Sequence, residues 1–106
     1  MKKIYLDIRY AKDCKARGYI LDISRLGIAS ATCGKIAKNT AVEIAIRQNP
    51  PLLLKGRVVS SVSRHKRRYG YRLGIKFLFS NKSSARQIAK FVSAIEKRKK
   101  LRLELG

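Results

Sequence analysis

The sequence has few of the residues on which catalytic and metal sites depend. It contains six carboxylates, one histidine, His65, and two cysteines, Cys14 and Cys33. No two carboxylates have the spacing of a general acid–base pair, and the cysteines fit neither a zinc motif nor a redox motif. A phosphate-binding loop and a dinucleotide fingerprint are also missing. We therefore expect no enzymatic activity, no metal and no cofactor.

Long hydrophobic runs are missing as well. No apolar stretch approaches the length of about 18 residues that a transmembrane helix needs. Lys2 and Lys3 open the chain, but alternating apolar and charged residues follow where a signal peptide would have an apolar block. Two unpaired cysteines are typical of a reducing compartment. We expect a cytoplasmic protein with no membrane span.

Acidic residues are scarce, whereas basic residues are abundant. The 26 lysines and arginines and the six acidic residues give a formal net charge of +20 over 106 residues. Residues 55–106 hold 16 of the 26 basic residues and only two of the six acidic ones. Such a charge attracts nucleic acids, nucleotides, acidic proteins and anionic lipids. Charge alone does not choose among these partners.

Most of the chain alternates apolar and polar residues with the period of two that is typical of half-buried strands. We expect six strands, at about residues 4–8, 19–23, 27–33, 41–47, 54–64 and 71–79, and a polar hairpin connection at residues 10–18. Six strands with short connections favour an antiparallel barrel or sandwich. A chain of 106 residues predicts one domain, residues 1–106, with the barrel at about residues 3–79.

The hydrophobic period changes after Phe79. A single helical stripe is formed by Ile88, Phe91, Val92 and Ile95. It predicts a C-terminal α-helix at about residues 83–100 that packs against the barrel, and Ser84 and Gln87 have the spacing of a capping box at its start. Residues Leu101–Leu105 would then be a short tail. This tail has three readings, namely a fraying end, a partner-binding strand or an oligomer contact.

A short connection between the second and third expected strands has the pattern Asp22-x-Ser24-x-x-Gly27. One reading is a plain turn, in which Asp22 and Ser24 bond backbone N–H groups and Gly27 supplies a positive φ. The other reading is a ligand site, in which the Asp22 carboxylate accepts two parallel N–H donors from a guanine edge. Ser24 would then bond a ribose or phosphate oxygen, and Gly27 would let the ligand approach.

A basic loop lies before the sixth expected strand and consists of Arg64, His65, Lys66, Arg67 and Arg68. A solvated basic turn is the simpler interpretation of the lone histidine there. Tyr69 and Tyr71 alternate with basic residues after it, a pattern that suits stacking on single-stranded nucleic acid. Tyr71 can equally belong to the sixth strand.

The ordered set of segments resembles the PilZ domain family. The resemblance rests on residues 17–29 with the Asp22-x-Ser24-x-x-Gly27 motif, residues 55–62, residues 71–79 with Gly74-x-x-Phe77, and the striped helix. It implies a mainly β fold, a six-stranded antiparallel β-barrel with one C-terminal α-helix. It also implies a non-enzymatic bacterial signalling module that binds cyclic di-GMP. By position, Asp22, Ser24 and Gly27 match the family's second ligand motif, which reads guanine and ribose–phosphate.

The family's first ligand motif, Arg-x-x-x-Arg on an N-terminal arm, is missing. Lys2 and Lys3 stand roughly where its second arginine would be, and Arg17 and Arg25 are further cations near the turn in sequence. Lysine lacks the planar guanidinium fork and stacks less well. Losing one bidentate base contact costs about 1–3 kcal/mol, or roughly ten- to hundredfold in affinity. The resemblance therefore implies weakened binding of cyclic di-GMP.

Three functions remain open from the sequence. The first is a cyclic di-GMP receptor built on Asp22, Ser24 and Gly27 with the four nearby cations and a contribution from the basic loop. The second is an adaptor that has lost the nucleotide and binds an acidic protein partner. The third is nonspecific, charge-driven binding of nucleic acid.

Overall fold

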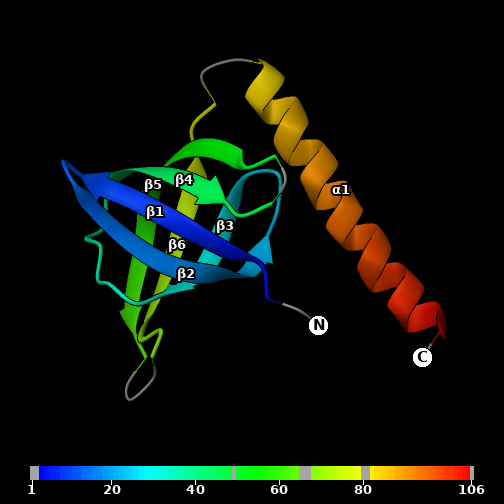
Figure 1. The fold of residues 1–106 in the computed structure, drawn as a ribbon, viewed down its shortest axis with the longest axis horizontal. Helices are drawn as coiled ribbons and strands as arrows, with labels where there is room; N and C mark the ends of the chain where they lie inside the picture. The colour runs from blue at the N-terminus through cyan, green and yellow to red at the C-terminus, as the bar shows by residue number, and fades with distance from the viewer. Residues whose placement is uncertain (1–2, 49, 65–67, 80–81, 106) are drawn as a thin grey trace.

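The computed structural model describes residues 3–48, 50–64, 68–79 and 82–105, with side chains in the helix described as far as Glu96. Six strands are followed by one helix (Figure 1). Their bounds are β1 Tyr5–Ala11, β2 Cys14–Ile23, β3 Gly27–Thr32, β4 Ala41–Ile46, β5 Leu52–Ser63, β6 Tyr71–Phe77 and α1 Lys82–Leu105.

The six strands close into one barrel in the order β1-β2-β3-β6-β5-β4, and every neighbouring pair is antiparallel. The prediction of a mainly β fold with a six-stranded antiparallel barrel is confirmed, and the sandwich alternative is wrong. Closure places β3 and β4 three strands apart in either direction around the barrel. The outer faces of these two strands therefore look to opposite sides of the molecule.

The core follows from the period of two. On β4 the residues Val42, Ile44 and Ile46 are buried, and the residues between them point outward. β6 repeats the pattern with Leu73, Ile75 and Phe77. All of these side chains belong to one hydrophobic cluster inside the barrel. The intervening residues of both strands are left on the outer surface.

The expected polar connection at residues 10–18 is much shorter in the structure. β1 continues to Ala11, and β2 begins at Cys14, so a two-residue turn of Lys12 and Asp13 joins them. Asp13 has a φ of 68°, a left-handed conformation that aspartate tolerates in tight hairpins. The small residues Ala16 and Gly18 face inward there, so the alternation carries too little hydrophobicity to predict a strand.

The predicted helix is confirmed, but the predicted tail is wrong. α1 runs from Lys82 to Leu105 and so includes the residues expected to follow it. The tail residues are leucine, arginine and glutamate, which are strong helix formers, and this propensity outweighs the period of two in the leucines. Ser84 lies in the first turn of α1. Within the described residues α1 has no stretch apolar enough to cross a membrane.

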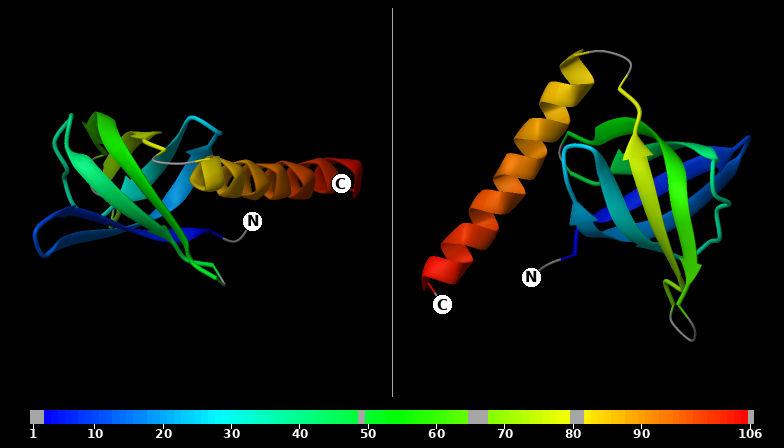
Figure 2. Two further views of the ribbon diagram at one scale, coloured as in Figure 1. Left: turned by 90° about the horizontal axis from the view of Figure 1, so that it is seen from above. Right: turned by 180° about the vertical axis from the view of Figure 1, so that it is seen from behind.

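The stripe on α1 joins the helix to the barrel. Ile88 is 1% exposed and Val92 is also buried, and both belong to the barrel's hydrophobic cluster, with Phe91 packed against it. The helix begins near the end of β6, and its last turns extend away from the barrel (Figure 2). The predicted packing of this stripe against the barrel is therefore confirmed.

Candidate ligand-binding site

The Asp22-x-Ser24-x-x-Gly27 segment forms the tight turn between β2 and β3. The Ser24 N–H donates to the Gly27 carbonyl oxygen at 2.9 Å. The Ser24 Oγ accepts the N–H groups of Leu26 at 3.2 Å and Gly27 at 3.3 Å. Ser24 therefore organises the turn, as the simpler reading predicts. Its O–H also donates to the Gly27 carbonyl oxygen at 3.5 Å, so the hydroxyl is engaged within the turn both as acceptor and as donor.

Gly27 is required for a different reason from the one expected. No glycine among the described residues has a positive φ. A Cβ at Gly27 would instead lie against the carbonyl oxygen of Ile75 on β6. Gly27 pairs with Lys76 at the first position of the β3–β6 ladder. The glycine thus permits the close approach of the two backbones where the turn enters the barrel.

Asp22 lies on the outer surface, next to a floor of small residues. Its Oδ1 accepts the N–H of Ile23 at 2.9 Å. Asp22 pairs across the strands with Ala29, and Ala29 pairs with Gly74. A bulge leaves Leu21 without a partner on β3 and turns Asp22 outward. The result is an exposed carboxylate beside two residues with almost no side chain.

The floor continues onto β5 and is bordered by two cations. Ser60 pairs with Gly74, and a Cβ on Gly74 would come within 2.5 Å of the Ser60 Oγ. Arg72 and Lys76 are exposed, and they lie two residues before and after Gly74 on the same outer face. These two cations were not among the predicted site residues, because only the strand register brings them close to Asp22.

Arg25 is the predicted cation that the structure places in the turn, and Lys3 lies against Tyr19 on β2. Arg25 is an exposed residue of the turn itself. The Ile4 carbonyl oxygen accepts the N–H of Ile20, so Lys3 lies beside the end of β2. The Lys3 Nζ lies 4.4 Å from the centre of the Tyr19 ring, a cation–π distance. Lys2 lies outside the described residues.

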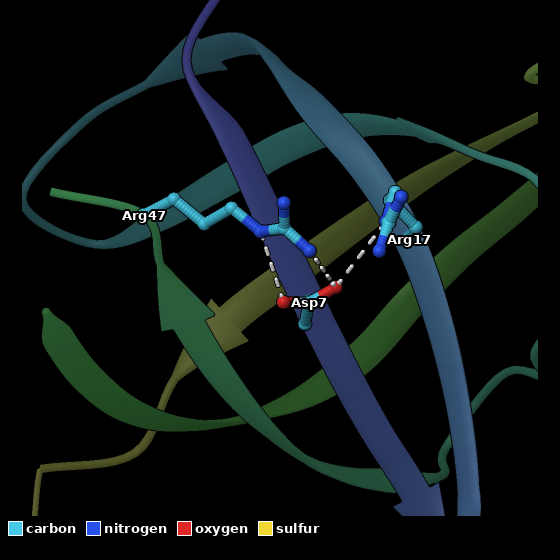
Figure 3. A network of polar contacts seen from close by, with 3 residues as sticks. All are labelled: Asp7, Arg17 and Arg47. Atoms are coloured by element: carbon cyan, nitrogen blue, oxygen red, sulfur yellow. Dashed lines mark hydrogen bonds and ion pairs between the residues drawn. The ribbon is translucent and has the colours of Figure 1, made fainter.

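Arg17 is placed elsewhere. It lies five residues before Asp22 on β2, or about 16 Å along an extended strand. The Arg17 Nε is 3.9 Å from Asp7 Oδ1, on the neighbouring strand β1 (Figure 3). The structure therefore brings Arg17 to Asp7 and not to the turn.

The predicted basic loop lies at the far end of the same strands. Thr32 and Tyr71 form the last pair of the β3–β6 ladder, about 17 Å from the first pair at Gly27. Arg68 is exposed and Arg64 is half-buried there, while His65, Lys66 and Arg67 lie outside the described residues. The structure does not bring the described part of this loop to the Asp22 turn.

The tyrosines near this loop pack against one another. The Tyr69 and Tyr19 rings meet edge to face with centres 5.2 Å apart, and Tyr5 and Tyr19 do so at 6.3 Å. Tyr69 and Tyr71 are both half-buried. The contact with Tyr19 gives Tyr69 a role in packing.

Metal-ligating side chains do not gather among the described residues. No group of three or more histidine, cysteine, aspartate or glutamate side chains is close enough to hold an ion in that part of the chain. Cys14 and Cys33 are both exposed free thiols.

The closed barrel and the helix packed on it define a small β-barrel module with an exposed polar turn. A family model described as PilZ domain matches residues 6–94, which is most of the chain. The chain belongs to the PilZ domain family, and the resemblance seen in its sequence is confirmed. A comparison with curated proteins found no match.

Two solved structures share this fold. The PilZ domain of YcgR from Escherichia coli, determined with c-di-GMP, matches with a TM-score of 0.79 and 14% sequence identity, over 96% of this chain and 88% of that one. The PilZ domain of CeSA from a cellulose-synthesizing bacterium matches with a TM-score of 0.72 and 19% identity, over 90% and 94%. At such identities the likeness is one of fold.

Proposed function

We propose that this chain is a non-enzymatic signalling module that binds cyclic di-GMP on the outer face of β2, β3 and β6. Family membership and the fold shared with a PilZ domain solved with c-di-GMP support the choice of ligand. The exposed free thiols favour a reducing compartment, the cytoplasm. Each of the site residues has a defined task in this proposal.

The observation that carries the proposal is the state of the Asp22 carboxylate. The chain has a net charge of +20, yet the only ion pairs among the described residues are those of Asp7. Asp22 is exposed and stands beside the Ala29–Gly74 floor, and within the described part of the chain it bonds only its neighbouring N–H. Its Oδ2 is available to accept an N–H of a guanine edge.

The remaining contacts follow from the geometry of the turn. The Ser24 O–H makes only a long contact of 3.5 Å with the Gly27 carbonyl oxygen, so it can turn to donate to a ribose or phosphate oxygen. Arg72 and Lys76 border the floor and would face the two phosphates, with Arg25 and Lys3 at its margin. Affinity would be weaker than in a site with an arginine arm, because a lysine offers only a point charge.

Isothermal titration with cyclic di-GMP tests the proposal. Asp22→Asn keeps the Oδ1 acceptor but replaces Oδ2 with an amide that repels a guanine N–H, so affinity should fall about ten- to hundredfold. Asp13→Asn is the matched control, because it removes one exposed carboxylate in the β1–β2 turn. Nonspecific attraction would make both variants bind more tightly, since both become more positive. That outcome, or no binding by the wild type at several hundred micromolar, would overturn the proposal.

A further inference from the structure

The outer face of β1, β4 and β5 carries a groove on the side of the barrel opposite the Asp22 turn. Two adjoining hollows, of about 420 and 320 Å³, share Arg9, Glu43, Lys55 and Leu78 in their walls. They therefore form one depression along β4, which we call the β4 groove. Its position follows from the strand order, because β4 and β3 lie across the barrel from each other.

The groove exists because β4 has small outward residues between two strands with large ones. The outward residues of β4 are Ala41, Glu43 and Ala45. Arg9 on β1 and Lys55 on β5 are the direct cross-strand partners of Glu43. Their long side chains form the two walls, and the alanines leave the floor low on either side of the glutamate.

The charge of the β4 groove is positive and unbalanced. The register aligns Lys15, Arg9, Glu43 and Lys55 in one row across β2, β1, β4 and β5. None of the four makes an ion pair within the described residues. Arg9 and Lys15 stand directly opposite each other, an arrangement of like charges that weakens a sheet. With three cations and one carboxylate, this row attracts an anionic partner.

One end of the groove is apolar. Leu53 is 67% exposed and Leu78 is 42% exposed, and Ala45 forms the floor beside them. Asp7, the other acid in the lining, does not compensate the cations because Arg47 and Arg17 already bind it. An occupant must therefore offer both carboxylates and an aliphatic side chain.

We propose that the β4 groove binds an acidic segment of a protein partner. Its aliphatic residue packs against Leu53 and Leu78, and its carboxylates reach Arg9 and Lys15 on one wall and Lys55 on the other. The groove spans Ala41 to Ala45, about 13 Å, which suits roughly four residues of extended peptide. Glu43 on the floor can accept a peptide N–H, a donor that the phosphate backbone of a nucleic acid does not offer. This site is independent of cyclic di-GMP, and both can be occupied together.

A synthetic octapeptide of alternating glutamate and leucine, labelled with fluorescein, is a suitable probe. With the full chain, fluorescence anisotropy should show saturable binding, and amide shifts in ¹⁵N spectra should concentrate on β1, β4 and β5. A lysine–leucine octapeptide should not bind. A single-stranded oligonucleotide of equal charge should not displace the acidic peptide.

Charge reversal locates the site. Lys15→Glu combined with Lys55→Glu should weaken peptide binding at least tenfold, and Leu53→Ser should weaken it severalfold. Lys35→Glu with Lys38→Glu is the matched control, because both lysines are exposed in the β3–β4 connection, outside the groove. Equal losses in the two double variants, shifts centred on the Asp22 turn, or displacement by the oligonucleotide would overturn the proposal.

Discussion

Arg47 holds the carboxylate of Asp7 in a two-point contact. The Nε lies 3.1 Å from Oδ2, and Nη2 lies 3.3 Å from Oδ1 (Figure 3). Asp7 is on β1, and Arg47 follows the last residue of β4, so the contact ties two neighbouring strands together. The Asp7 side chain is only 19% exposed, which separates it from the other surface carboxylates. A bidentate pair of this kind is stronger than an ordinary surface ion pair.

Asp7→Asn should therefore lower the free energy of unfolding by about 1 kcal/mol. The asparagine keeps the shape of the side chain but loses the charge that Arg47 and Arg17 share. Urea unfolding followed by circular dichroism measures the effect. Asp13→Asn removes an exposed acid in the same hairpin and reports the general cost of added positive charge. Equal destabilisation by the two variants would show that the contact with Arg47 adds nothing.

Gly27→Ala tests the close approach of β3 and β6. The new Cβ would meet the Ile75 carbonyl oxygen, which belongs to the backbone and cannot swing aside. Overpacking of this kind costs about 1–3 kcal/mol. At Gly34 an added Cβ would lie 3.5 Å from the Ala16 Cβ, an ordinary contact. Gly34→Ala should leave stability unchanged or raise it slightly. If chemical denaturation gives the two variants similar stabilities, the packing role of Gly27 is contradicted.

Ile88→Ala tests how α1 is attached. Ile88 is fully enclosed between the helix and the barrel, so its truncation should cost about 2–4 kcal/mol. Hydrogen exchange should accelerate first in the amides of α1, because the stripe is the helix's contact with the core. Gln87→Ala changes an exposed neighbour and should alter stability by less than about 0.5 kcal/mol. Unchanged exchange along α1 in the Ile88 variant would be inconsistent with this packing.

The fold was largely predictable because its main signals are periodic and local. Buried alternation on β4 and β6 and the four-residue stripe on α1 are visible in any short window of the sequence. The prediction failed where small inward residues made β2 look polar, and where leucines spaced two apart at residues 101–105 suggested a break in the helix. On β2, backbone pairing determined the strand despite the weak pattern. At residues 101–105, helix propensity determined the helix.

The candidate site was predictable only as far as its residues are continuous in sequence. The turn is contained in six residues, so its motif could be found without a structure. Arg72 and Gly74 join it through the ladder from β2 to β3 to β6, a register that no local pattern contains. For the same reason the sequence could not show that Arg17 is bound by Asp7, since that contact depends on the pairing of β1 with β2.

Substitution of the cations on β6 best distinguishes specific binding of cyclic di-GMP from general charge attraction. Arg72→Gln combined with Lys76→Gln should weaken cyclic di-GMP binding about tenfold, equivalent to about 1.4 kcal/mol, because both residues border the floor beside Asp22. Lys35→Gln with Lys38→Gln removes the same two charges from the β3–β4 connection, so it matches the change in net charge. Its affinity should stay within about twofold of the wild type, since distant exposed charges are screened at physiological salt.

Calorimetry of both double variants in 0.15 M salt (about 8 Å screening length) decides the point. If cyclic di-GMP is held only by the overall charge of +20, the two pairs lose affinity equally, because each lowers that charge by the same amount. If Arg72 and Lys76 face the phosphates, only the β6 double variant loses affinity. If the wild type binds cyclic di-GMP and the Arg72→Gln, Lys76→Gln variant binds it equally well, these two cations are not part of the site. The role proposed for Asp22 would be unaffected.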